Sequence, residues 1–512
     1  MAGFLISPAL GYLQTHSERG NSRRFAAVII VAASCLCLSA LALLTSYFCP
    51  IQRKSIDLCR TPSYPYSKAD DSRLLATSVG GSVSPQNVIT ATNLSHVVFG
   101  IAASSELWEK RKEYLKLWWK PKKMRGFVWL EKKVRYTEED AKTLPPQMLS
   151  ADTMRFKYTS RLGRRSGIRI SRIVSEMYRL GLPDVRWFVM SDDDTIFVAK
   201  NLLRVLSKYD HKQFYYIGSN SESHMQNLAF SYNMAYGGGG FAISYPLAKA
   251  LSSMQDDCLH RYPSLVGSDD RIHACMAELG VPLTKEPGFH QYDIRGNALG
   301  LLAAHPLTPA ISLHHLDAIN PVFPNRTTLE ALNHLQRSID EDPTHFLQQS
   351  ICYEKDRIWS ISISWGYVVQ IFRGVIEPRE LEVPLRTFYS WNRKADFTTF
   401  AFNARAYPRH PCERPTLFYM HNITTSSRQE RPRVESFYIR DAATSSPCPW
   451  TMPSPTSIDL IKVSRHKDEN MWNKAPRRKC CHVLKKRTPK GTVSSFLEID
   501  IHDCSSSEIA TL

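Results

Sequence analysis

Three consecutive acidic residues, Asp192, Asp193 and Asp194, follow a mainly apolar run at residues 185–190. Side chains alternate along an extended chain, so Asp192 and Asp194 are expected on one face and Asp193 on the other. Two carboxylates with open positions beside them suit Mg²⁺ or Mn²⁺ shared with the phosphates of a substrate. The alternative is an acidic turn after a strand, and the triplet alone does not decide between the two.

A glycine-rich segment follows downstream, made of Gly237, Gly238, Gly239 and Gly240 in front of an apolar strand. Four glycines let the backbone approach a ligand closely and adopt positive φ angles. A flexible bend before the strand is the structural alternative. The segment is not a phosphate-binding P-loop, because no Gly-Lys-Ser/Thr sequence follows it.

Two further clusters carry titratable side chains. Asp269 and Asp270 open a predicted helix that runs to about Leu279, where they could cap the helix or act as a general base on an acceptor hydroxyl. His314 and His315 lie next to each other in an apolar stretch. Adjacent histidines often have no catalytic or metal-binding role, but beside a divalent metal one imidazole would be a plausible third ligand.

The elements predicted around these clusters alternate between strands and helices. Strands are expected at 96–101, 126–130 and 185–190, and helices at 107–119, 168–180 and 202–209. This order indicates an α/β fold with a mostly parallel sheet covered by helices. Ligands of such sheets bind at the carboxyl ends of the strands. The acid triplet would lie at that edge, which favours the metal site over the acidic turn.

The pattern of the sequence changes from about residue 350, where a smaller β-rich region, 351–512, is expected. Its predicted strands lie at 361–371, 386–390 and 397–402, with little helical periodicity between them. Six cysteines of this part could form disulfides among themselves: Cys352, Cys412, Cys448, Cys480, Cys481 and Cys504. Cys258 and Cys275 flank the Asp269–Asp270 pair and could bridge to hold it. No catalytic motif or internal repeat is visible in the C-terminal region.

Charge and composition restrict the function less than the motifs do. The 512-residue chain has a formal net charge of +17, with 43% hydrophobic residues, as expected of a folded protein. The basic excess lies in patches at 110–135, 155–172 and 477–490, which suits sugar nucleotides, acidic glycans, membrane headgroups or nucleic acid. No zinc-finger spacing, RNA-recognition signature or basic heptad region supports nucleic acid.

The N-terminal part predicts a membrane anchor. Residues 25–48 are uncharged and long enough to span a bilayer, whereas the apolar region of a cleaved signal peptide, the alternative, is usually shorter. The segment 49–92 is rich in Ser, Thr and Pro and is expected to be a stalk. Three Asn-x-Ser/Thr glycosylation acceptors follow the span: Asn93, Asn325 and Asn422. Together with the downstream cysteines they indicate a cytosolic tail at 1–24, a signal anchor and a lumenal body.

In their order, these motifs resemble those of the fringe-like glycosyltransferases of family 31, and most closely those of the plant fringe-related group that carries a domain of unknown function. The resemblance covers roughly residues 95–350 and, in the plant group, extends through the C-terminal region. It rests on five segments: Trp187–Thr195, Tyr216–Ser219, Ala235–Ser244, Ser268–Asp270 and Ser312–Asp317.

The resemblance implies a nucleotide-diphosphosugar transferase (GT-A) fold for residues 93–350, with 96–119 cradling the uridine. It implies Mn²⁺, or Mg²⁺, bound directly by Asp194, with Asp192 nearer the ribose or bound through water. The histidine ligand would be His314, with His315 close enough to leave the register open.

For the substrates, the resemblance implies that Gly237–Gly240, with Asp193, border the donor sugar and the acceptor. It assigns the general base to the pair Asp269 and Asp270, and we favour Asp270. Arg271–His273 depart from the family pattern, so acceptor contacts there cannot be transferred.

The expected protein is an inverting glycosyltransferase that moves a sugar from a UDP-sugar to a glycan or glycoprotein, with a β-1,3 linkage. It would be a single-pass type II Golgi membrane protein with its catalytic domain in the lumen and no nucleic-acid partner. A lumenal binding protein that has lost turnover is the first alternative. A metal-dependent phosphodiesterase or nuclease is the second, since acids, histidines and a basic surface fit it too.

Overall fold

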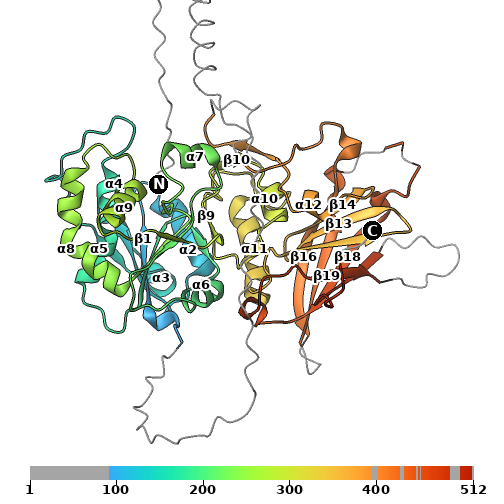
Figure 1. The fold of residues 1–512 in the computed structure, drawn as a ribbon, viewed down its shortest axis with the longest axis horizontal. Coiled ribbons are helices and arrows are strands. Elements are labelled where there is room, and N and C mark those ends of the chain that lie inside the picture. The colour runs from blue at the N-terminus through green and yellow to red at the C-terminus, as the bar shows by residue number, and fades with distance from the viewer. Residues whose placement is uncertain are drawn as a thin grey trace, which may run out of the picture. The chain divides into compact units, whose positions relative to one another are not determined.

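A computed structural model describes residues 91–393, 402–426, 432–444, 448–449, 451–484 and 496–509 (Figure 1). All of them belong to one compact unit. The predicted tail 1–24, the predicted anchor 25–48 and nearly all of the predicted stalk lie outside the described residues. Among the helices that the structure describes, none is long and apolar enough to cross a membrane.

The first part of the chain forms a seven-stranded mixed sheet in the order β3-β2-β1-β4-β7-β6-β8. The strands are β1 (Val97–Ala102), β2 (Arg125–Leu130), β3 (Gln147–Leu149), β4 (Trp187–Asp192), β6 (Tyr216–Gly218), β7 (Phe241–Ser244) and β8 (Leu283–Lys285). β3, β2, β1 and β4 run parallel, β6 and β8 also pair parallel, and only β7 is antiparallel to its neighbours β4 and β6. β4 therefore ends at the same sheet edge as β1.

Helices cover both faces of this sheet because its strands are apolar on both sides (Figure 1). Phe99 and Trp187 belong to one core cluster with side chains of α2 (Trp108–Trp118) and α6 (Ala199–Leu206). Val98 and Phe188 belong to a second cluster, with side chains of three helices: α5 (Ile173–Arg179), α8 (Tyr245–Arg261) and α9 (Ser268–Glu278). The remaining helices of more than one turn are α3 (Glu138–Thr143), α4 (Ser166–Ser171), α7 (His224–Ala229), α10 (Leu299–Ala303) and α11 (Thr328–Glu341).

The C-terminal part forms an eight-stranded sheet in the order β12-β13-β14-β16-β17-β18-β20-β19. Its strands are β12 (Gln349–Glu354), β13 (Trp359–Ser364), β14 (Val368–Arg373), β16 (Thr416–Ser426), β17 (Arg433–Arg440), β18 (Leu460–His466), β19 (Cys480–Val483) and β20 (Phe496–His502). All pairings are antiparallel except that of β18 with β20. α11 contacts both α2 and β16, and one apolar cluster runs from the first sheet into this one.

Three predicted elements differ from the structure. The single helix expected at 168–180 is two helices, α4 and α5, which meet at Arg172. The single strand expected at 361–371 is the hairpin of β13 and β14, which turns at Gly366 with φ +76°. The strand expected at 386–390 is β15 (Phe388–Ser390), which pairs with β10 (Ile294–Gly296) instead of joining the C-terminal sheet. Residues 397–401 lie outside the described part of the chain.

Four disulfides are present, and the predicted pairing of Cys258 with Cys275 is confirmed. The other six cysteines pair within the C-terminal region, as expected, in the bridges Cys352–Cys481, Cys412–Cys448 and Cys480–Cys504. Of the three predicted glycosylation acceptors, Asn93 and Asn325 are exposed, whereas Asn422 is half-buried on β16 and accepts a hydrogen bond from Arg337.

Removing the Cys258–Cys275 bridge is expected to destabilise the part of the fold that carries the Asp269–Asp270 pair. The bridge joins α8 to α9 and closes a loop of 17 residues. A disulfide that closes a loop of this length stabilises a fold by about 3 kcal/mol. We expect Cys258→Ala with Cys275→Ala to lower the free energy of unfolding by about that amount. Urea unfolding followed by circular dichroism measures the change, and an unaltered midpoint would contradict it.

Candidate active site

The acid triplet lies where β4 ends and the chain turns. Asp192 is the last residue of β4 and is half-buried, whereas Asp193 and Asp194 are buried. Thr195 holds the turn: its hydroxyl accepts a hydrogen bond from the Asp192 N–H at 3.1 Å and donates one to the Gly238 carbonyl at 2.7 Å. The turn is thereby tied to the glycine-rich segment.

A small sheet brings the histidines to the acids. β5 (Ile196–Phe197) follows the triplet after Thr195 and pairs antiparallel with β11 (Ser312–Leu313). Leu313 therefore lies opposite Ile196, and His314 comes next to the triplet. The His314 Nε2 atom is 3.2 Å from Asp194 Oδ1 and 3.7 Å from Asp192 Oδ2. Ligand atoms of these three residues all lie within 4.8 Å of one another, so the site has the donor set of a divalent-metal site.

Glycines are required where this cluster meets its neighbours. A Cβ atom on Gly238 would overlap the imidazole ring of His314, and one on Gly237 would overlap the Asp269 carboxylate. Gly240 has φ +88°, a backbone conformation that side-chain-bearing residues rarely adopt. Segment 237–240 therefore lets His314 and Asp269 approach the backbone on either side of it.

The electrostatics of the cluster fit a bound cation. Burial alone would lower the pKa of His314, but the carboxylates of Asp194 and Asp192 outweigh it and raise this pKa to about 9. Burial likewise opposes ionisation of Asp194, yet the charges of His314 and Arg111 hold its pKa well below the usual value. Neither carboxylate oxygen of Asp194 accepts a hydrogen bond of good geometry from the described residues. A cation would take the place of the imidazole proton, because a metal binds neutral imidazole.

Arg111 of α2 neutralises the acids from the other side. Its guanidinium lies 2.8 Å from Asp193, 2.9 Å from Asp194 and 2.9 Å from Asp317. Asp193 has no exposed surface, and the backbone N–H of Ser104 lies 3.4 Å from its second oxygen. This side chain thus ties β4 to α2, and its predicted contact with donor or acceptor stays a prediction.

Replacing Arg111 by Met is expected to destabilise the fold strongly. Asp193 would remain buried without its cation, and breaking a buried ion pair from one side costs about 3–5 kcal/mol. The Arg111→Met variant should therefore lose that much unfolding free energy in a urea titration. Arg261→Met is the matched control, since Arg261 pairs with Glu278 at the surface, and equal losses in the two variants would reject the argument.

The Asp269–Asp270 pair lies in the first turn of α9, and its two members have different surroundings. Asp269 accepts hydrogen bonds from the Ser268 hydroxyl at 2.9 Å and from the Gly237 N–H. Burial, with the nearby charge of Asp192, raises the pKa of Asp269 to about 6. Burial also raises the pKa of Asp270, against the opposing effects of a Val266 backbone hydrogen bond and of the charges of Arg271 and His273. Asp269 is thus the member that faces the cluster of Asp192, Asp194 and His314.

A small cavity joins these groups and includes a side chain from beyond the first sheet. Asp192, Asp269, Asp270 and His314 line it, and so does Trp391. Trp391 reaches it because β15 pairs with β10 and the chain continues directly past Ser390. No sequence motif predicts this residue.

The second histidine has a different environment from the first. His315 stacks on Trp391 with 4.5 Å between ring centroids and 8° between planes, and its Nδ1 lies 3.4 Å from Asp293. His314, by contrast, lies between Asp192 and Asp194. Of the two histidines, His314 is therefore the one that lies among the carboxylates of the triplet.

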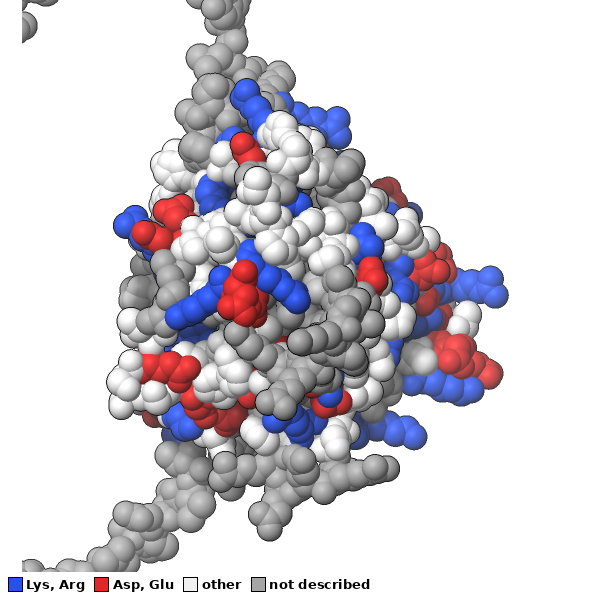
Figure 2. Space-filling model, turned by 90° about the vertical axis from the view of Figure 1, so that its right-hand side faces the viewer, with Lys and Arg blue, Asp and Glu red and all other residues white. Residues whose placement is uncertain are grey.

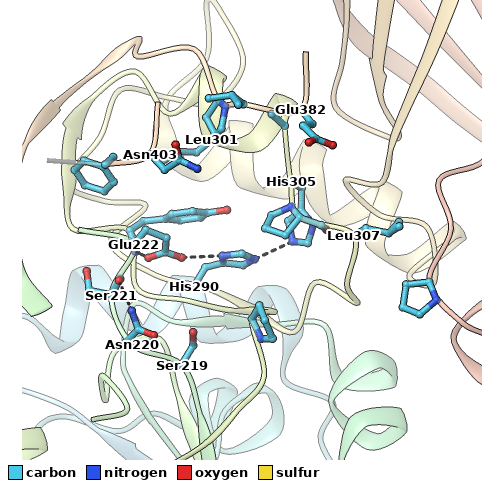
Figure 3. Close-up of a pocket in the computed structure, with 18 of the residues that line it drawn as sticks. Ser219, Asn220, Ser221, Glu222, His290, Leu301, His305, Leu307, Glu382 and Asn403 are labelled. Atoms are coloured by element: carbon cyan, nitrogen blue, oxygen red, sulfur yellow. Dashed lines mark hydrogen bonds and ion pairs between the residues drawn. The ribbon is translucent and has the colours of Figure 1, made fainter. Parts of the chain in front are cut away.

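A larger cavity, of about 710 Å³, lies on the other side of segment 290–293 (Figure 3). Gln291 and Asp293 face the small cavity, whereas His290 and Tyr292 face the larger one. Its remaining walls come from both parts of the fold, including Leu301, Glu382, Phe402 and Arg477. The acid triplet does not line this cavity.

Among the described residues that line that cavity, His290 and His305 are joined in one hydrogen-bonded chain. Nδ1 of His290 lies 2.8 Å from Glu222, and its Nε2 lies 2.8 Å from Nε2 of His305, whose Nδ1 donates to the Pro306 carbonyl (Figure 3). Burial holds the pKa of His305 well below its usual value, so His305 is neutral and its Nε2 accepts. His290 then donates from its Nε2 to His305, and its Nδ1 lies beside the Glu222 carboxylate.

Of the basic patch predicted at 477–490, residues 485–490 lie outside the described part of the chain, and two of the described basic residues form ion pairs. Arg478 pairs with Glu382, and Lys479 pairs with Asp468 and Asp503. On the face shown in Figure 2, basic and acidic side chains lie intermingled.

Comparison with known proteins gives two findings. A family model described as "Protein of unknown function, DUF604" matches residues 226–481, which are 256 of the 512 residues. The chain is 30% identical to a human beta-1,3-glucosyltransferase over 105 residues and 31% identical to a mouse beta-1,3-glucosyltransferase over 107 residues. These matches cover 20% and 21% of this chain and the same shares of the two relatives. The chain thus spans about a fifth of the length of the curated relatives it matches.

Proposed function

The chain belongs to the DUF604 family of proteins of unknown function, and we propose that it is a metal-dependent glycosyltransferase that uses a UDP-sugar. One observation carries the proposal: Asp192, Asp194 and His314 converge at the end of β4, with Asp269 across the glycine segment from them. The partial similarity to beta-1,3-glucosyltransferases supports the same class. We further propose a GT-A fold for the first part of the chain, since a parallel run of strands ends at this site.

In the proposed reaction, Asp269 removes the proton of an acceptor hydroxyl while that oxygen attacks the anomeric carbon of the donor sugar. The bond from that carbon to the diphosphate oxygen breaks, and the diphosphate leaves with the electron pair. Attack opposite the leaving group inverts the configuration. Asp192, Asp194 and His314 would hold Mn²⁺, which when bound supplies positive charge to the departing diphosphate.

The finer assignments belong to the same proposal: a β-1,3 linkage, a glycan or glycoprotein acceptor, and a single-pass type II protein of the Golgi membrane. They are supported by the motif order, by the glucosyltransferase matches and by four disulfides typical of an oxidising compartment.

Release of UDP from a panel of common UDP-sugars tests the proposal. The purified protein should hydrolyse or transfer at least one donor with Mn²⁺ present, and a chelator should stop the reaction. No turnover with any donor, together with UDP binding that is unchanged in Asp194→Ala, would instead indicate a protein without catalysis. Nucleic-acid cleavage that is lost in the same variant would indicate a phosphodiesterase.

Trp391 is expected to contribute to acceptor binding. It is an aromatic side chain in the cavity that holds Asp269, and aromatic residues of this kind often contribute about 2 kcal/mol to binding, or roughly 30-fold in affinity. We expect Trp391→Ala to raise the acceptor KM by that factor and to leave UDP-sugar hydrolysis nearly unchanged. Phe214→Ala is the control, because Phe214 is exposed and lines neither cavity. Equal effects on transfer and hydrolysis would contradict the assignment.

A further inference from the structure

A second cluster of metal-binding side chains lies at the edge of the C-terminal sheet. β19 pairs antiparallel with β20, so that His482 is opposite Asp500 and Cys480 is opposite His502. Alternate residues of a strand share one face, which places His482, Asp500 and His502 on the same face of this strand pair. Each offers a ligand atom within 4.8 Å of the others. We propose that these three side chains form a second metal site, which takes a transition-metal dication such as Zn²⁺.

The hydrogen bonding of His502 supports this site. Its Nε2 lies 3.0 Å from a carboxylate oxygen of Glu508, so the proton of the neutral ring belongs on Nε2. The other nitrogen, Nδ1, is buried and has no hydrogen-bond partner among the described residues. A carboxylate on one nitrogen with a free lone pair on the other is the usual arrangement of a metal-binding histidine.

Asp500 keeps one oxygen available for a metal. Its Oδ1 pairs with the guanidinium of Arg433 and is 3.5 Å from the Ser464 hydroxyl, which fixes the orientation of the carboxylate. No hydrogen bond from the described residues to Oδ2 accompanies this pairing. The Arg433 contact thus positions Asp500 in the way that outer hydrogen bonds orient metal-binding carboxylates.

The strands that carry the cluster are held rigidly. Cys480 is bonded to Cys504, and the neighbouring Cys481 is bonded to Cys352 of β12. The first bridge ties β19 to the segment directly after β20, and the second ties it to a strand at the other end of the sheet order. Fixed strands lower the entropy cost of closing a three-ligand site.

The ligand set distinguishes this site from the proposed active site. Two imidazoles and one carboxylate suit Zn²⁺ and similar ions, whereas the active-site cluster has two carboxylates and one imidazole, a harder set that suits Mn²⁺. The second site therefore goes beyond the proposed function. It would clamp β19 to β20 and take no part in sugar transfer.

Zinc titration of the full-length protein tests the site. The Asp194→Asn background weakens the active-site cluster, and a chelator first removes bound metal. Isothermal titration with Zn²⁺ should show one more bound ion in this background than after the additional change His482→Ala or His502→Ala. Glu508→Gln, which keeps the side-chain shape but loses the charge, should weaken that binding about tenfold or more. The matched control is His421→Ala, which removes an exposed histidine of β16 outside the cluster.

A second measurement, of the unfolding temperature, shows whether each variant is folded. Zn²⁺ should raise the unfolding temperature of the Asp194→Asn protein, and His482→Ala should abolish the rise without lowering the unfolding temperature measured with chelator. Equal zinc stoichiometry with and without His482 and His502 would overturn the proposal. So would a zinc-dependent rise that survives both histidine substitutions.

Discussion

Asp194→Asn is expected to abolish turnover of the UDP-sugar. The substitution keeps the shape of a buried side chain but removes the charge that lies 3.2 Å from His314 and 2.9 Å from Arg111. A catalytic divalent ion stabilises the transition state of the reaction by several kcal/mol. Loss of about 4 kcal/mol of this stabilisation corresponds to roughly a 10³-fold lower rate. We expect that loss in initial rates of UDP release, accompanied by loss of the Mn²⁺ dependence of UDP binding.

Asp317→Asn is the matched control for this substitution. Asp317 contacts the same guanidinium as Asp194, at 2.9 Å, but does not belong to the cluster of candidate metal ligands. A metal role for Asp194 predicts a small effect of the control and a large effect of Asp194→Asn. If both variants lost activity equally, the damage would come from a disturbed Arg111 and not from a lost ligand. Wild-type turnover by Asp194→Asn would reject the metal site.

Local patterns in the sequence were sufficient to predict the elements next to the acid triplet. A short apolar run followed by acids predicts a strand and its end, and the structure has β4 at Trp187–Asp192. α8 was missed although it is the longest described helix of the first part, with buried residues at Leu247, Leu251 and Cys258. The spacing of these residues is helical. The helix is hard to recognise in the sequence because it begins directly after a strand, with Pro246 in its first turn and no loop between the two elements.

Long-range pairings account for what the sequence could not predict. The choice between His314 and His315 depends on the pairing of β11 with β5, more than a hundred residues away in the chain. Trp391 enters the cavity through the pairing of β15 with β10. Neither register leaves a local pattern of polar and apolar residues, because these strands are only two or three residues long.

The second large effect is expected at the general base. Asp269 faces the cluster of candidate metal ligands, and Asp270, which we favoured from the family pattern, lies next to Arg271 and Val266. Loss of a general base lowers rates about 10²–10⁴-fold. We therefore expect a loss in this range for Asp269→Asn and a smaller one for Asp270→Asn, measured as transfer to an acceptor. Full transfer by Asp269→Asn, with loss in Asp270→Asn, would return the role to Asp270.

The pH profile separates a base from a residue that only supports the fold. Burial raises the pKa of Asp269 to about 6, and only its carboxylate form can accept the proton of the acceptor. Activity should therefore fall tenfold per pH unit below that value and level off above it, in a plot of kcat/KM against pH. A cation bound next to Asp192 would move this limb to lower pH, because positive charge favours the carboxylate. A structural role predicts that the residual activity of Asp269→Asn keeps the acidic limb of the wild type, so the same limb in both proteins at saturating Mn²⁺ would remove Asp269 as the base.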